Sequence, residues 1–383
     1  MVALNFGNRA YSSYTLGLPR LATTRRPVGC ARAQRAGRWR RPGQRQPARP
    51  ARVCLNIQND KGKAKPECPR SCTPWRFCYD GRAHAPANPC HARRSRVLRA
   101  IAKKSGRAND EYLRLYALEG FLLRLAASAS SQDFVLKGGV LLAAYHLRRP
   151  TADIDFAALK TSNDVGAIKS KIITVADTQL PDDQDDGLWF DTSDTHAVAI
   201  RDEDPYSGVR VTLGAQLAPA KMRFHVDVNV GDPIWPSPAT VQFPRLLGGH
   251  ITLLGYPIPM VLAEKIVTAS QRGITSTRWR DFADIYLLTG QHRLVADDIR
   301  AAINKVSTYR NTEMDPLRPV LDGYPALAQA KWHAWRTRQN LEDRLPGDFH
   351  DVLESVFVFT DGLFDITGTS QADIWSPGDR TWS

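Results

Sequence analysis

The sequence predicts an α/β (α+β) fold with a mixed sheet, then a C-terminal helical domain, behind a basic N-terminal segment with no fold of its own. Three observations predict this. Residues 1–95 are rich in Arg, Pro, Ala and Gly and show no apolar periodicity. Between residues 96 and 255, short apolar or alternating strands are mixed with helical patterns. From 256 to 365 the periodicity is helical, and 366–383 is a polar tail.

The first 95 residues differ from the rest of the chain in charge. They contain 20 Lys and Arg but 3 Asp and Glu, whereas the remaining residues carry a net charge of −4. Such a segment cannot bury enough apolar surface to offset its ordering entropy, so we expect a disordered extension. The alternatives are an Arg-rich arm that adds nonspecific nucleic-acid affinity and a zinc site, although the cysteine spacing fits no common zinc pattern.

Two observations concern the compartment. All six cysteines precede residue 95, so the rest of the chain forms no disulfide, which fits a cytoplasmic location. The chain has no run of eighteen apolar residues, and we therefore expect no membrane-spanning helix.

The elements of the predicted sheet begin after a helix. Apolar residues recur at helical spacing over Asn109–Ser130, and Phe134–Lys137 is a short apolar strand. Val140–Leu147 is expected to be helical, and Pro150 then forces a turn. Asp153–Leu159 alternates between polar and apolar residues, as a strand does.

The later elements complete the sheet and the helical domain. The acidic stretch Asp182–Asp194 is expected to be a solvated loop, Val209–Leu217 and Arg223–Val230 a hairpin, and Ile251–Leu254 a strand. The expected helices that follow are Met260–Gln271, Arg278–Leu288, Ala301–Val306, Tyr324–Arg336 and Phe349–Phe359.

Paired aspartates mark the first candidate site. Because side chains alternate along a strand, Asp153 and Asp155 share one face while Ile154 and Phe156 share the other. Two neighbouring carboxylates repel each other unless a cation lies between them. Ligands that are all oxygen favour Mg²⁺ or Mn²⁺.

A second alternating strand offers a third carboxylate. Residues 225–230 read His-Val-Asp-Val-Asn-Val, so the valines face the core and Asp227 faces the other side. If this strand lies beside the first, Asp227 joins Asp153 and Asp155. Such a cluster is suited to a two-metal site for phosphoryl transfer.

Two further motifs are suited to a triphosphate. Lys137, Gly138 and Gly139 end a strand and open a helix, which lets phosphate approach the backbone, and Thr151 adds a hydroxyl. Lys265 is a compact cation that also suits a phosphate. Asp281 could orient Lys265 or act as a general base.

Each motif alone is also compatible with an ordinary solvated strand, a turn or a surface ion pair. Their order along the chain is more specific. Residues 136–139 and 148–156, with the later runs 262–266 and 280–284, resemble the AbiEii/MenT family of nucleotidyltransferase toxins, within the polymerase-β-like nucleotidyltransferase superfamily. The resemblance covers roughly residues 96–360, and it departs from the family pattern at Val140, where a hydroxyl residue is usual.

The resemblance implies a metal pair on Asp153 and Asp155, with nucleotide contacts at Lys137, Gly138, Gly139 and Lys265. It gives Asp281 a catalytic or Lys-orienting role. It implies transfer of a nucleoside monophosphate from a nucleoside triphosphate, most simply to the 3′ end of tRNA. It also implies a cognate antitoxin, often a winged-helix regulator. Asp227 as a third carboxylate is inferred from strand alternation together with the general architecture of the superfamily.

Two alternatives remain at this stage. The acceptor could be a protein or a small molecule such as an aminoglycoside, or the chain could be a non-catalytic nucleic-acid-binding relative. A net charge of −4 outside the first 95 residues predicts that any RNA-binding surface is local. The candidates to hold acceptor phosphates are Arg148, Arg149, Lys221, Arg223, Arg272, Arg278 and Arg280.

Overall fold

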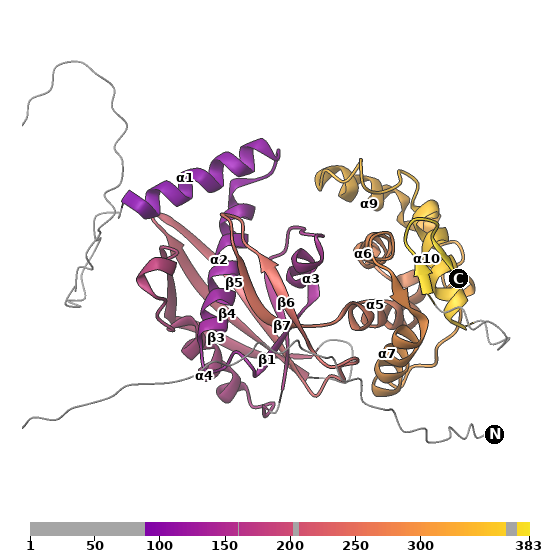
Figure 1. Cartoon of the computed structure of the whole chain (residues 1–383), viewed down its shortest axis with the longest axis horizontal. Coiled ribbons are helices and arrows are strands. Elements are labelled where there is room, and N and C mark those ends of the chain that lie inside the picture. Colours follow the sequence, from indigo (N-terminus) through magenta and orange to yellow (C-terminus); the bar gives the residue numbers. More distant parts are fainter. Residues whose placement is uncertain (1–88, 160, 202–206, 365–373) are drawn as a thin grey trace, which may run out of the picture. The chain divides into compact units, whose positions relative to one another are not determined.

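The structure is a computed structural model that describes residues 89–159, 161–201, 207–364 and 374–383 (Figure 1). All of these residues belong to the unit Thr73–Ser383. The expectations for the basic extension, as far as residue 88, lie outside the described residues. Residues 89–95, which were expected to belong to that extension, are helical.

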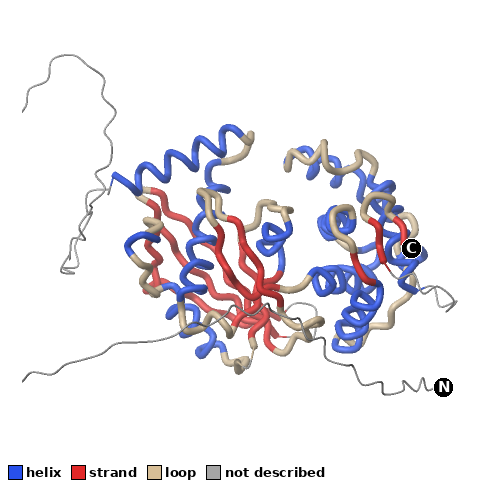
Figure 2. The backbone as a smooth tube through the Cα atoms, in the orientation of Figure 1, coloured by secondary structure: helices blue, strands red, loops and turns tan. Residues whose placement is uncertain are grey.

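A seven-stranded mixed sheet forms the first part of the fold, with strand order β3-β4-β5-β2-β1-β7-β6 (Figure 2). β2 runs parallel to β5, and β1 runs parallel to β7, while the remaining neighbours are antiparallel. The strands are β1 (Phe134–Lys137), β2 (Asp153–Ala158), β3 (Leu188–Arg201), β4 (Ser207–Leu217), β5 (Ala220–Val230), β6 (Ala239–Pro244) and β7 (His250–Gly255).

Helices cover one face of this sheet. The alternating apolar residues of β4 and β5, such as Val211 and Val226, are fully buried on that face. α2 (Asn109–Ala127) and α4 (Val165–Ala176) pack there against β3, β4 and β5. α1 (Pro89–Lys104) packs against α2. On β3, β4 and β5 the opposite face carries polar or exposed side chains. It includes Asp227 of β5, which lies beside Asp155 of β2.

The second part of the fold is mainly helical, as the sequence predicts. A small three-stranded sheet of order β10-β9-β8 joins these helices, and Trp375 of β9 is fully buried. The elements are α3 (Gly138–Leu141) in the first part, then α5 (Ile258–Arg272), α6 (Trp279–Thr289), β8 (Leu294–Val295), α7 (Ala296–Tyr309), α8 (Leu317–Val320), α9 (Tyr324–Arg338), α10 (Phe349–Phe364), β9 (Ile374–Ser376) and β10 (Thr381–Trp382).

Three local expectations differ from the structure. The part of the acidic stretch from Leu188 onward, which was expected as a loop, lies in β3, where Leu188 and Phe190 face the core and Asp194 is exposed. The helix expected over 140–147 is a four-residue helix followed by a 3₁₀ turn that ends at His146, which has a positive φ. The polar tail contributes β9 and β10, because Trp375 packs beneath it. Sequence periodicity did not predict α1, α4 or β6.

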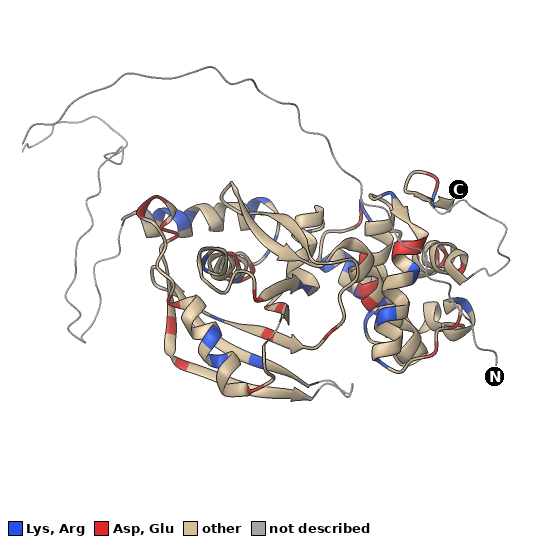
Figure 3. Cartoon of the chain, turned by 60° about the horizontal axis from the view of Figure 1, so that its bottom comes forward, with Lys and Arg blue, Asp and Glu red and all other residues tan. Residues whose placement is uncertain are grey.

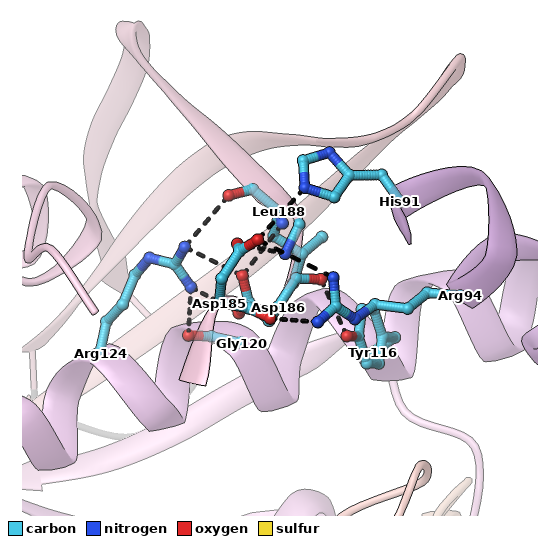
Figure 4. Close-up of polar contacts among 9 residues, drawn as sticks. His91, Arg94, Tyr116, Gly120, Arg124, Asp185, Asp186 and Leu188 are labelled. Atoms are coloured by element: carbon cyan, nitrogen blue, oxygen red, sulfur yellow. Dashed lines mark hydrogen bonds and ion pairs between the residues drawn. The ribbon is translucent and has the colours of Figure 1, made fainter. Parts of the chain in front are cut away.

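A buried ion pair fixes the start of β3 against α2 (Figure 4). The Arg124 guanidinium donates to both carboxylate oxygens of Asp186, at 2.7 and 3.1 Å, and to the carbonyl oxygens of Gly120 and Leu188. The Tyr116 hydroxyl donates to the Asp186 carbonyl at 2.9 Å. Every oxygen of the Asp186 carboxylate therefore has a partner, which buried charges require.

Replacing Arg124 with methionine is expected to lower the free energy of unfolding by about 3–5 kcal/mol, because Asp186 would remain buried and unpaired. Denaturant unfolding measures this. Arg99→Met, on the exposed side of α1, is the matched control and should change stability by less than about 0.5 kcal/mol. Equal stability of the two variants would contradict the prediction.

Candidate active site

Asp155 and Asp227 lie side by side on the open face of the sheet. The parallel ladder between β2 and β5 pairs Asp155 with Asp227 and Asp153 with His225. Because paired residues of adjacent strands point to the same side, the register brings the three predicted carboxylates onto one face. The Thr151 hydroxyl donates to Asp153 Oδ1 at 2.9 Å, so it orients the first aspartate.

Gly138 lies against Asp155 and has to be glycine. Its φ is +66°, and a Cβ added there would lie 1.8 Å from Asp155 Oδ2. A side chain at residue 138 would therefore displace the carboxylate. At Gly139, a Cβ would lie 3.2 Å from an Arg149 nitrogen and 3.3 Å from Thr151 Oγ1. The Gly-Gly turn, Thr151 and the aspartates thus meet at one place.

The environment of Asp155 disfavours a bare carboxylate. Burial and the neighbouring carboxylates of Asp153 and Asp227 raise the pKa of Asp155 to about 7, against the opposing effect of Lys137. Among the described residues, Asp155 has no cation within ion-pair distance. A divalent cation would offset this repulsion, and the donor set of carboxylate oxygens fits Mg²⁺ or Mn²⁺.

Asp227 is held by a cation that the sequence analysis did not consider. Arg210 of β4 lies opposite Asp227 in the antiparallel ladder. Its Nε and Nη2 donate to the two carboxylate oxygens at 2.8 and 2.6 Å. Within the described ranges, no group of three or more His, Cys, Asp or Glu side chains is arranged to hold a metal ion.

Lys137 is also occupied. Its ammonium donates to Asp232 Oδ2 at 2.6 Å and to Glu264 Oε1 at 3.2 Å, and it lies over the ring of Tyr256. Burial lowers its pKa, but Glu264 and Asp232 more than reverse this, so the pKa of Lys137 is raised and the side chain is charged.

A second network joins α5 to α6. The Lys265 ammonium donates to Asp281 Oδ1 and to Asp284 Oδ2, each at 2.7 Å. Arg149 donates to Asp284 at 3.2 Å, and Arg278 lies 2.8 Å from Asp281. Burial would raise the pKa of Asp281, yet Lys265 and Arg278 lower it to about 2. Such a carboxylate is a very weak base, so the geometry favours the Lys-orienting role over general-base catalysis.

Sequence reasoning missed the partners of these residues. It gave no role to Arg210, Asp232, Glu264 or Asp284, all of which are ion-paired in the structure. Two weak signals were available. Arg210 occupies a polar position of an alternating strand, and Asp284 follows Asp281 by three residues, which places both on one side of a helix.

Five of the seven predicted RNA-binding cations fall into two groups, while Arg272 of α5 and Arg280 of α6 belong to neither. Arg148, Arg149 and Arg278 take part in ion pairs with Glu119, Asp284 and Asp281. Lys221 and Arg223 instead lie exposed on the open face of β5, where Arg223 contacts Asp194.

Among the described residues, no helix combines the length and the apolar character needed to cross a membrane.

Solved structures and one protein family are similar to this chain. JHP933 from Helicobacter pylori has 15% sequence identity and a TM-score of 0.36, with 64% of this chain and 88% of that chain covered. A second structure, described as a "putative nucleotidyltransferase from H. pylori", has 15% identity and a TM-score of 0.27, with 60% of this chain and 97% of that chain covered. No curated protein matches the sequence. The family described as "Nucleotidyl transferase AbiEii toxin, Type IV TA system" matches residues 120–360. The chain therefore belongs to the AbiEii family of nucleotidyltransferase toxins from type IV toxin–antitoxin systems.

Proposed function

We propose that this nucleotidyltransferase is metal-dependent and transfers a nucleoside monophosphate from a nucleoside triphosphate to a hydroxyl at the 3′ end of tRNA. The observation that carries the proposal is the register of β2 and β5. It places Asp155 beside Asp227 and Asp153 on the same face, next to the turn formed by Gly138 and Gly139.

Asp153 and Asp155 would hold the cation, with Asp227 as the third carboxylate. A bound Mg²⁺ or Mn²⁺ supplies positive charge that stabilises the triphosphate and the entering oxygen. The residues fit such an ion because all the donors are oxygens and because burial, together with the like charges of Asp153 and Asp227, raises the pKa of Asp155.

The other residues of the site bind and orient the nucleotide. Thr151, Gly138 and Gly139 line the place where phosphate would approach the backbone. Lys265 binds a phosphate from the helical side, and Asp281 positions it, as the 2.7 Å contact supports. Lys137 reaches the nucleotide by exchanging Asp232 or Glu264 for a phosphate oxygen.

The reaction is a displacement at the α-phosphorus. A bond forms between the acceptor hydroxyl oxygen and the α-phosphorus, and the bond between that phosphorus and the bridging oxygen breaks. Pyrophosphate leaves with the electron pair, and the hydroxyl proton passes to water. The acceptor end must therefore reach Asp153 and Asp155.

The open face of β3, β4 and β5 is suited to a single-stranded acceptor. On β5 this face begins at Asp227 and carries Arg223 and Lys221. Trp189 lies on β3, and β3 and β5 flank the same part of β4 at these residues. Trp189 is 53% exposed, and Lys221 lies about 20 Å along the strand from Asp227. Exposed aromatic rings stack on unpaired bases, and cations bind the backbone phosphates.

Charge outside this face is mixed. Figure 3 shows basic and acidic residues interspersed over the sheet and the helices. This supports a local acceptor surface, as expected from the net charge. The family also implies a cognate antitoxin, and we propose a winged-helix regulator in that role.

The test of the proposed function uses the full chain, Mg²⁺, each α-labelled nucleoside triphosphate in turn and total tRNA. Label on tRNA supports the proposal and identifies the base. Label on a protein or a small molecule instead would mean that the acceptor is not tRNA, while the proposed transfer reaction would stand. Absence of both transfer and nucleotide binding would contradict the proposal.

Removing the exposed ring from the open face is expected to weaken acceptor binding. Trp189→Ala should raise the KM for the RNA about 10–100-fold, because one stacked base contributes about 1–3 kcal/mol. The kcat and the affinity for nucleotide should change little. Leu327→Ala, which removes an exposed apolar side chain of α9, is the control. An unchanged KM for Trp189→Ala would exclude this face as the acceptor surface.

A further inference from the structure

Arg210 and Asp227 form a bidentate ion pair in the candidate site. The two residues are directly opposite each other in the ladder between β4 and β5. Both nitrogens of the contact are within 2.8 Å of a carboxylate oxygen, so the guanidinium occupies both oxygens. Asp227 is 10% exposed, whereas the Arg210 side chain is 39% exposed and has room to turn away.

This pair has a consequence for metal binding. Asp153 and Asp155 are the carboxylates of the described site without an ion-paired cation, while Arg210 blocks the third. An arginine cannot lose its proton at physiological pH, so it competes with a divalent cation for Asp227 through its charge. Asp232 and Glu264 are likewise held, by Lys137.

We propose that Arg210 gates Asp227, withholding this carboxylate from a divalent cation until the guanidinium turns to an anionic phosphate of the incoming nucleotide. The inference rests on the proposed function and adds a regulation of the same site. Arginine binds phosphate as well as carboxylate in a bidentate manner, so the exchange costs it no hydrogen bond. Cation and nucleotide then bind cooperatively, and each raises the affinity for the other.

The test measures Mn²⁺ alone, without nucleotide, by electron paramagnetic resonance titration of the full chain. Arg210→Gln should bind Mn²⁺ about tenfold more tightly than wild type. When Arg210 is present, Asp227→Asn should change the Mn²⁺ affinity less than about twofold. In the Arg210→Gln protein, the same substitution should return the Mn²⁺ affinity to that of wild type. This dependence on background distinguishes a gate from a merely structural ion pair.

Arg318→Gln is the matched control, because Arg318 also binds both oxygens of one carboxylate, that of Glu354. It should leave the Mn²⁺ affinity unchanged. If Arg210→Gln does not fold, Arg210→Lys keeps the charge, loses the bidentate contact and should show an intermediate gain.

Two results would overturn the inference. If wild type and Arg210→Gln bind Mn²⁺ with equal affinity and still transfer nucleotides, Arg210 does not gate Asp227, but the proposed function stands. Absence of Mn²⁺ binding in both proteins, together with absence of transfer, would remove the gate and the metal-dependent function together.

Discussion

Replacing Lys265 with methionine is expected to lower the free energy of unfolding by about 3–5 kcal/mol, because two buried carboxylates would lose their shared cation. Asp284 has 3% of its side chain exposed and Asp281 has 11%. Arg149 and Arg278 would remain, but each contacts one of the two carboxylates. Transfer should fall as well, because the proposed phosphate ligand is lost. Denaturant unfolding and the tRNA-labelling assay measure the two effects.

The pH dependence identifies the cause of this loss. The folded-state pKa of Asp281 is about 2, below its ordinary value of 3.8. A depressed carboxyl pKa contributes stability that is present above pH 4 and is lost as the pH falls towards 2, on the order of 2 kcal/mol here. As the pH falls from 4 towards 2, the free energy of unfolding of Lys265→Met should decrease less than that of wild type. Lys305→Met, at an exposed position of α7, should behave as wild type does. Identical acid profiles for Lys265→Met and wild type would contradict the assignment.

Replacing Asp155 with asparagine is expected to lower transfer by roughly 10³-fold or more while it stabilises the fold. The loss of transfer follows from removing a proposed metal ligand. The gain in stability follows from the raised pKa of Asp155, because an ionised carboxylate there is buried and is repelled by Asp153 and Asp227. Function and stability are thus expected to move in opposite directions.

The sign of the stability effect can be checked with EDTA present. A folded-state pKa of about 7 means that wild type loses stability as the pH rises from 4 through 7. Asp155→Asn lacks this titration, so its advantage should grow across the window and reach roughly a few kcal/mol at pH 8. Asp351→Asn, at an exposed position of α10, is the control. A destabilised Asp155→Asn at pH 8 would contradict the prediction.

Local patterns were enough to predict the strands that carry the site. Alternation along β2 and β5 predicted which face of each strand carries Asp155 and Asp227, because the direction of side chains along a strand is a local property. The condition that the two strands be neighbours is met in the structure. The apolar strand β1 was predicted with its observed bounds. The mixed sheet and the helical second part were likewise confirmed.

The ion pairs of the site could not be predicted in this way. The contact between Arg210 and Asp227 depends on the register between two strands, and the contact between Lys137 and Asp232 depends on the path of the chain after β5. Neither contact can be recognised within a short stretch of sequence. β3 was missed because four aspartates directly precede it and make the whole stretch look like a solvated loop, although Leu188 and Phe190 are buried.

The strand order has a consequence for folding kinetics. β2 pairs with β5 across the intervening β3 and β4, and β1 pairs with β7 over a still longer separation. Such parallel, non-local pairings close large loops and form slowly. We therefore expect the aspartates to meet late on the folding pathway. A newly made chain would pass through an inert interval before it can modify anything, and a partner protein could act during that interval.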